Sequence, residues 1–352
     1  MKKNQFIKYK SLLKFSKNVL LKSDVNKFSA MSVSKGLCDA SLRGVDSHGI
    51  RLLPHYVKSV ICGRKNGKPN FKVTKKYPAV ACLNADNAFG IAAGIKAVDI
   101  GMRLSNKYGI SAVAVYNSSH PGALASIVLE SARKGFLTLS FTHADSLLKT
   151  YNGKKAYFGT NPICFAVPRG INKDPYCLDM ATSVISWNKL INYKSLNKKL
   201  PKGVAASSLG NETVNSKNAF SLLPIGGYKG YGLASMVEIL CSILTGMNFG
   251  KNIISMYLGS IYKKRKLGQF YIFIKNDICV TNSKFIQSMI KLSKEVRSEP
   301  SIKNKKIMLP NDPEINCSKI RKINGIPINH SLFLELQQLG ENYKEELKFF
   351  PL

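Results

Sequence analysis

Two histidines stand in short polar segments that could carry acid–base chemistry. His120 lies in Asn117-Ser-Ser-His-Pro-Gly-Ala123, between an apolar run that predicts a buried strand and a predicted helix. Ligand-binding groups of α/β proteins gather at such strand ends. Pro121 suits the first turn of the helix, so we expect the helix dipole to lower the pKa of His120 from about 6.5. A neutral imidazole can accept a proton at pH 7, which makes His120 a candidate general base.

The second histidine, His48, belongs to Gly44-Val-Asp-Ser-His-Gly49, which is followed by Arg51 and Tyr56. A histidine between serine and glycine at the end of a helix can line a polar cleft. It can equally well be an ordinary turn or capping residue, and the segment alone leaves both interpretations open.

Three further segments could bind anions. Gly159-Thr-Asn-Pro162 and Asp179-Met-Ala-Thr-Ser183 place small and hydroxyl residues next to predicted strands, where backbone N–H groups can contact an anion. Ordinary turn chemistry explains the same residues. The glycines of Gly226-Gly-Tyr-Lys-Gly-Tyr-Gly232 precede an apolar helix, so a phosphate or carboxylate could approach the helix N-terminus with Lys229 as its counter-charge.

The elements that must position these segments alternate between strand and helix. Apolar spacing predicts two or three helices within the first 60 or so residues. The later prediction is a strand at 79–83, a helix at 91–108 ended by Gly109, strands at 110–116 and 136–142 around a helix at 124–134, strands at 162–167 and 176–178, a loop or lid at 189–221, a helix at 229–245, a strand at 270–274, a helix at 283–296, and basic loop with a final helix at 331–339.

This alternation predicts an α/β core with helical segments at both ends of the chain. We expect a helical subdomain formed by residues 1–75 together with 285–352, and a catalytic α/β domain over 76–284. No strand leads into G-x-G-x-x-G, and G-x-x-x-x-G-K-[ST] is absent, so a Rossmann dinucleotide site is not predicted.

Composition indicates a globular protein with an unusual charge. The 352 residues include 53 Lys and Arg against 20 Asp and Glu, a formal charge of +33. The lysines are scattered, which favours solvated surface over a nucleic-acid footprint. Eight dispersed cysteines without C-x-x-C predict neither a zinc site nor a disulfide framework, and suggest a reducing cytoplasm. The most apolar segment, 231–247, is short for a membrane span and carries Glu238, so no membrane partner is expected.

Taken together and in this order, the polar segments resemble the malate/L-lactate dehydrogenase type 2 family from about residue 30 to about residue 340. The resemblance implies an α/β, non-Rossmann fold with a mixed-sheet NAD-binding core, a homodimer, and oxidation of a small 2-hydroxy acid. NAD is the implied cofactor, with NADP not excluded. No metal is needed, because a base and a hydride acceptor complete the reaction.

The resemblance also implies roles for individual residues. His120 matches the proton acceptor, and His48 is the second histidine of the catalytic site. The implied substrate-binding residues are Ser47, Arg51 and Tyr56. The implied cofactor contacts are Ala144, Asp179, Met180, Ala181, Lys229, Gly230, Asn311, Asp312 and Pro313.

Within the family, the segments 85–88, 157–160, 255–257 and 267–269 are most similar to members that oxidise (S)-ureidoglycolate to oxalurate. Malate, L-lactate and sulfolactate are the alternative substrates. Many relatives carry arginine where this chain has Leu52, and Arg51 stands one position early, which is about 100° of rotation on a helix. The cofactor loop at 311–313 also lacks the family's glycine. A decayed NAD-binding relative is therefore a further alternative.

Overall fold

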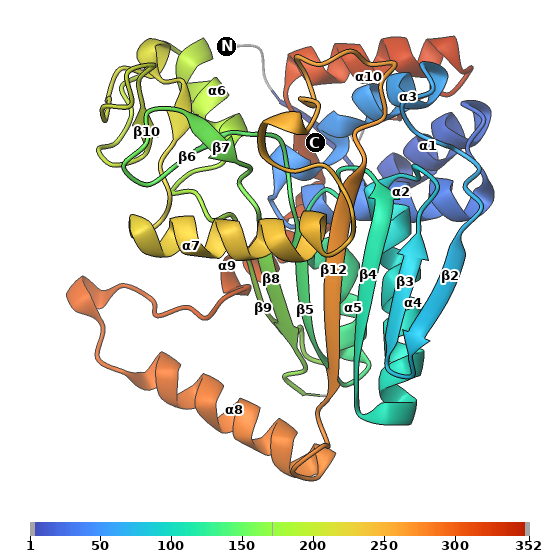
Figure 1. Cartoon of the computed structure of the whole chain (residues 1–352), viewed down its shortest axis with the longest axis vertical. Helices are drawn as coiled ribbons and strands as arrows, with labels where there is room; N and C mark the ends of the chain where they lie inside the picture. The colour runs from blue at the N-terminus through green and yellow to red at the C-terminus, as the bar shows by residue number, and fades with distance from the viewer. Residues whose placement is uncertain (1–3, 171, 349–352) are drawn as a thin grey trace.

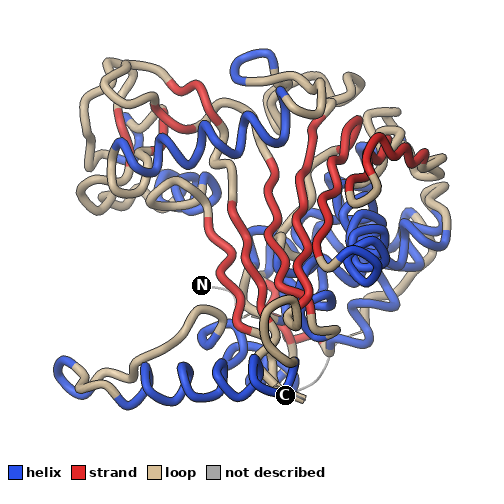
Figure 2. Tube along the Cα trace, turned by 60° about the horizontal axis from the view of Figure 1, so that its bottom comes forward, coloured by secondary structure: helices blue, strands red, loops and turns tan. Residues whose placement is uncertain are grey.

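A computed structural model describes residues 4–170 and 172–348 of the chain. A large sheet forms its centre, and helices from both ends of the chain gather at the upper right of Figure 1. A smaller lobe stands at the upper left of the same view. Helix α8 (Asn282–Ser298) extends along the bottom of the molecule, set off from the sheet in Figures 1 and 2.

The central sheet has seven strands and mixed direction, as the sequence predicted. Only the neighbours β3 and β4 run parallel; the other adjacent strands are antiparallel. Strand β4 is nearly continuously apolar because helices cover both faces of the sheet beside it. In spatial order the strands are β2 (Lys72–Tyr77), β3 (Val80–Asn84), β4 (Ile110–Ser118), β12 (Leu267–Lys275), β5 (Phe136–Thr142), β8 (Ile163–Val167) and β9 (Tyr176–Met180).

Helices α4 (Gly90–Tyr108) and α5 (Ala125–Arg133) pack on one face of this sheet. Gly101 of α4 lies so close to the sheet that a Cβ there would meet the ring of Phe273 at 2.1 Å. Helix α4 ends at Gly109, whose φ of 78° requires glycine, as predicted. The outer face of the sheet is covered by α7 (Tyr228–Glu238) and a π-helical turn at Ile239–Ile243, where one continuous helix was predicted.

The two ends of the chain meet through a short sheet. Strand β1 (Gln5–Ile7) pairs antiparallel with β13 (Ile326–Ile328). These three-residue strands were not predicted, because they are too short to show alternation. Helix α10 contacts α1 and α3 beside them, while the domain boundaries stay a prediction. The helices of this group are α1 (Tyr9–Lys22), α2 (Lys27–Leu42), α3 (Leu53–Ile61) and α10 (His330–Asn342), with the 3₁₀ turns η1 (Asp46–His48) and η2 (Ile50–Leu52) between α2 and α3.

Two predictions for irregular segments were wrong. The expected loop or lid at 189–221 contains α6 (Trp187–Ser195) and two strands of a four-stranded sheet around a separate core that includes Leu190 and Leu222. The expected basic loop after 296 contains α9 (Asp312–Asn324), which buries only Asp312 and Ile315 and so shows little apolar periodicity. The small sheet runs β10 (Ala205–Ala206), β11 (Ser221–Leu222), β6 (Leu148–Lys149) and β7 (Ala156–Phe158).

The described helices include none with the length and apolar character to cross a membrane. All eight cysteines are free thiols. The expected cytoplasmic location stays a prediction.

Phe273 tests the packing between α4 and the sheet, because its side chain is fully buried against Gly101 and Tyr271. We expect Phe273→Ala to lower the free energy of unfolding by about 3–5 kcal/mol, since it leaves a cavity in the core. Phe220, which is 63% exposed, is the matched control, and its replacement by alanine should change stability by less than about 0.5 kcal/mol. Urea unfolding followed by circular dichroism measures both. Equal losses in the two variants would contradict this packing.

Candidate active site

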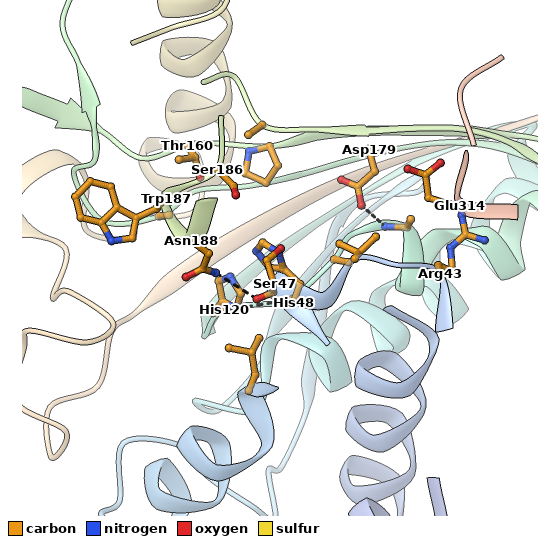
Figure 3. A pocket seen from close by; sticks show the side chains of 18 of the residues that line it. Arg43, Ser47, His48, His120, Thr160, Asp179, Ser186, Trp187, Asn188 and Glu314 are labelled. Atoms are coloured by element: carbon orange, nitrogen blue, oxygen red, sulfur yellow. Dashed lines mark hydrogen bonds between the residues drawn. The ribbon is translucent and has the colours of Figure 1, made fainter. Parts of the chain in front are cut away.

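A deep pocket opens where loops from the sheet, the helical group and the small lobe converge (Figure 3). It encloses about 1040 Å³, at the upper limit of the roughly 300–1,000 Å³ typical of small-molecule sites. Its wall includes residues that follow strands β4 and β5, the end of β9, both 3₁₀ turns and the segment leading into α9. Residues that lie far apart in the sequence thus meet in one cavity.

His120 is held by an unusually close backbone crossing. It follows β4 and packs against the first residue of α4, Gly90, where a Cβ would lie 2.1 Å from the carbonyl oxygen of Ser119. The Ser119 hydroxyl accepts a hydrogen bond from the Gly90 N–H at 3.0 Å and donates to the Ala88 carbonyl at 2.9 Å. The predicted position of Pro121 was wrong: α5 begins only at Ala125, so Pro121 lies in the loop before it.

Two side chains contact the imidazole of His120, and a third contacts its neighbour His48. Its ring stacks on that of His48, with centroids 5.4 Å apart and planes 19° from parallel. The Tyr56 hydroxyl lies 3.1 Å from Nδ1 of His120. Ser47 Oγ lies 2.9 Å from Nδ1 of His48. Figure 3 shows both histidines and Ser47 at the centre of the pocket.

Both histidines are uncharged at neutral pH, for a reason other than the predicted helix dipole. Burial lowers the pKa of His120 well below 6.5, and His48 lowers it further. Burial, followed by the charge of Arg51, lowers the pKa of His48 to about 4. His120 therefore has the protonation state of a general base at pH 7, as predicted.

Arg51 lines the pocket although it stands one position earlier than the family pattern. It belongs to the 3₁₀ turn η2, and both Arg51 and its neighbour Leu52 line the pocket, so the shift by one position does not take Arg51 out of the site. The guanidinium of Arg51 can bind an anion close to the two neutral histidines.

At the opposite end of the pocket, Asp179 and Glu314 lie near Arg43 (Figure 3, right). Oδ2 of Asp179 accepts a hydrogen bond from the N–H of Ala125 at the start of α5, at 2.8 Å. Burial raises the pKa of Asp179 to about 6, although backbone hydrogen bonds oppose the shift. Arg43 donates a hydrogen bond to Asn311, and Glu314 lies near Arg43 on the same wall.

The predicted site residues fall into two groups. Those that line the pocket are Ser47, His48, Arg51, His120, Ala144, Asp179, Ala181, Asn311 and Pro313. The other group consists of Tyr56, Met180, Asp312, Lys229 and Gly230, and the predicted roles of both groups stay predictions. Tyr56 is buried behind His120. The Asp312 carboxylate pairs with Arg169 and Arg297, and Lys229 is exposed at the start of α7.

Several lining residues were not predicted as site residues. They are Arg43, Thr160, Ser186, Trp187, Asn188 and Glu314. The Asn188 side chain donates a hydrogen bond to the Ser47 carbonyl at 3.2 Å, so it ties α6 to the histidine turn across the pocket. Thr160 and Asn188 lie in or near motifs that the sequence analysis singled out. Arg43 had no such signal, because its partner Asn311 is 268 positions away.

The asparagine of Gly159-Thr-Asn-Pro162 has a structural role. Asn161 is fully buried, accepts a hydrogen bond from the Ala144 N–H at 3.2 Å and donates to Glu238 at 2.7 Å. It therefore fixes the loop after β5 to helix α7, and this loop forms part of the pocket wall.

The sequence is similar to those of known dehydrogenases. Residues 7–337 match the family model described as malate/L-lactate dehydrogenase. The chain is 30% identical over 292 residues to ureidoglycolate dehydrogenase (NAD(+)) of Escherichia coli K12, covering 83% of both proteins. It is 32% identical over 342 residues to malate dehydrogenase of Pyrococcus abyssi, covering 94% of this chain and 92% of that one.

Two solved structures have the same fold as this chain. Sulfolactate dehydrogenase from Methanocaldococcus jannaschii superimposes with a TM-score of 0.90 at 27% identity, covering 97% of this chain and 98% of that one. Malate dehydrogenase from Entamoeba histolytica gives a TM-score of 0.91, with 99% of both chains covered, and its 24% identity speaks for the fold alone.

The anion-binding role of Arg51 can be tested through the single tryptophan, Trp187, which lines the same pocket. We expect oxamate, a small carboxylate, to change Trp187 fluorescence saturably. Arg51→Gln should raise its Kd about ten- to a hundredfold, because a charge-assisted hydrogen bond is lost. Lys58→Gln, a cation removed from the exposed side of α3, is the control and should bind as wild type does. Equal Kd values for Arg51→Gln and wild type would show that the anion binds elsewhere.

Proposed function

The chain belongs to the malate/L-lactate dehydrogenase family, and from this premise we propose that it oxidises a small 2-hydroxy acid with NAD, with (S)-ureidoglycolate as the preferred substrate. The single observation that carries the proposal is the stacked, uncharged pair His48 and His120 beside Arg51 in one pocket. This oxidation requires the protein to supply a base and a cation that binds the carboxylate.

The pocket suits a dinucleotide together with a small acid. Its volume of about 1040 Å³ exceeds what a small hydroxy acid needs. Asp179, Ala181, Asn311 and Pro313 line the end away from the histidines and would hold the cofactor there. When bound, NAD supplies the acceptor for the hydride.

The chain's own groups account for the proton and the carboxylate. His120 accepts the hydroxyl proton while the C2–H bond breaks and its electron pair leaves as hydride, so that C2 and its oxygen become a carbonyl. Arg51 holds the carboxylate, and burial keeps His120 neutral and ready to accept the proton. Protonation of His120 blocks this step, so activity should fall as pH drops toward its lowered pKa.

The charge of the pocket favours ureidoglycolate over a diacid. Arg51 and Arg43 are its lining cations in the described chain, and Figure 3 shows Arg43 at the far end beside Glu314. Ser47, Thr160 and Asn188 add neutral polar side chains to the wall, and the carboxylate of Asp145, which also lines it, is already paired with Arg265. Ureidoglycolate carries one carboxylate and a neutral urea group, whereas malate and sulfolactate each carry a second anion that would lack a counter-charge.

Malate is the second candidate substrate, because the P. abyssi malate dehydrogenase matches a longer part of the chain. Arg43 could supply a second counter-charge only if it left Asn311. Malate would thus need a second counter-charge in this pocket, and ureidoglycolate would not. The kcat/KM values for the two acids distinguish these alternatives.

Absorbance of NADH during incubation with NAD and each acid tests the activity. We expect ureidoglycolate to give the highest kcat/KM, and His120→Gln to lower kcat by about 10²–10⁴-fold because the proton acceptor is lost. His330→Gln removes a histidine from the start of α10 and should leave kcat unchanged. Parallel assays with malate, L-lactate, sulfolactate and NADP rank the alternatives. Folded protein that binds NAD but oxidises none of these acids would contradict the proposal and favour a decayed relative.

We propose further that the chain acts as a homodimer through an apolar stripe on α7 and the turn after it. Met236, Ile239 and Ile243 are 39%, 52% and 59% exposed, and their spacing places them on one face. Figure 1 shows this helix across the outer face of the sheet. A continuous exposed apolar stripe is typical of an interface, and a second copy would cover it without unpaired charge.

Light scattering after size exclusion tests the dimer. We expect wild-type protein to elute with the mass of two chains. Ile239→Asp with Ile243→Asp should give single chains, because two carboxylates would be buried unpaired. Ile61→Asp, an equally drastic change at a 67% exposed position on α3, should stay dimeric. A dimer that survives the double substitution would place the interface elsewhere.

A further inference from the structure

A lysine with no role in the chemistry above is buried behind the candidate site. Lys65 lies in the turn after α3 and is only 4% exposed. In the described part of the chain, its Nζ has no hydrogen-bond partner. Lysine is almost never buried without a partner, because removing an ammonium group from water is costly. Its position therefore needs an explanation.

The amine of Lys65 is held against an aromatic ring. Its Nζ lies 3.4 Å from the centroid of the Tyr56 ring and 5.1 Å from that of Phe89. The backbone N–H of Lys65 donates to the Ser59 carbonyl at 3.0 Å, and the N–H of Asn66 donates to the Asn87 carbonyl at 3.0 Å. The turn is thus fixed both to α3 and to the segment before α4, which keeps the amine over the ring.

Tyr56 in turn contacts the candidate base. Its hydroxyl lies 3.2 Å from the carbonyl oxygen of His120 and 3.1 Å from Nδ1. When the phenol donates to the carbonyl, its oxygen accepts a hydrogen bond from the N–H at Nδ1. That tautomer leaves Nε2 unprotonated, as a base facing the pocket requires. The Gly122 N–H, 3.3 Å from Nδ1, favours the opposite tautomer.

We propose that Tyr56 and Lys65 are positioning residues: the Tyr56 hydroxyl holds His120 in the tautomer with Nδ1 protonated, and the buried Lys65 amine fixes the Tyr56 ring from its face. The proposal rests on the function proposed for His120, and it gives Tyr56 a place behind the base instead of the substrate contact that the sequence predicted.

The two residues act on the proton affinity of His120 in opposite directions. The groups that face His120 are Tyr56 and His55 of α3, His48 of η1, Lys65 of the turn after α3, and Arg265 ahead of β12. A cation at Lys65 lowers the pKa of His120. The Tyr56 oxygen instead stabilises the imidazolium, because a hydrogen bond from a charged donor is stronger than one from a neutral donor. Removing each group should therefore shift the pKa with opposite sign.

Titration of the histidines by ¹³C NMR tests this directly, with label at Cε1 of all five histidines. Tyr56→Phe removes only the hydroxyl, and we expect the His120 midpoint to fall by about one pH unit. Lys65→Met keeps the length of the side chain without its charge, and the midpoint should rise. Lys68→Met removes an exposed lysine from the same turn and should leave the midpoint unchanged.

Enzyme kinetics provide a second test of the roles of Tyr56 and Lys65. In Tyr56→Phe we expect the plateau kcat to fall about tenfold or more with little change in KM, because part of His120 takes the wrong tautomer. The acid limb of kcat/KM should move to lower pH in Tyr56→Phe and to higher pH in Lys65→Met. A loss of packing alone would lower stability without moving the limb.

His120 midpoints and acid limbs indistinguishable from wild type in folded Tyr56→Phe protein would overturn the proposal, and this variant decides even if Lys65→Met does not fold. The titration needs no substrate. Wild-type protein that oxidises no hydroxy acid would therefore reject the proposed function, while the NMR midpoints would still decide whether Tyr56 and Lys65 control His120.

Discussion

Two histidines must stay uncharged inside a strongly basic protein, and the rest of the site depends on this constraint. Burial disfavours the imidazolium form of both His48 and His120. The guanidinium groups around them, Arg51 beside His48 and Arg265 beside His120, act in the same direction. A neutral base can therefore sit close to a guanidinium, and the same pocket can bind a carboxylate and accept a proton.

The loop that carries His120 is positioned by a backbone crossing so close that no side chain fits there. Gly90 lets the loop after β4 pass directly over the start of α4. The Gln269 side chain locks the crossing, because it donates to the Gly90 carbonyl at 3.1 Å and to Ser118 Oγ at 2.8 Å. Asn161 does the same for the loop after β5 through Ala144 and Glu238. Rigid elements thus set the position of the base before a ligand arrives.

The sequence alone predicted elements whose side chains repeat a pattern over many residues. The run that forms β4 and the helix closed by Gly109 are of this kind. Strands of two or three residues, such as β1 and β10, contain too few side chains to show alternation, and α9 buries too little to show a helical face. Most site residues came from resemblance to a family. The contacts of Tyr56 with His120 and of Arg43 with Asn311 join positions 64 and 268 residues apart, which no local pattern can predict.

The central claim is that the pocket removes hydride from C2 of a hydroxy acid while His120 takes the hydroxyl proton. Oxidation of ureidoglycolate deuterated at C2, with mass analysis of the reduced cofactor, tests it most directly. The account predicts one deuterium in each molecule of reduced cofactor and a primary isotope effect whenever C–H cleavage limits the rate. Reduced cofactor without deuterium, or deuterium released to solvent, would contradict direct transfer and with it the role assigned to this site.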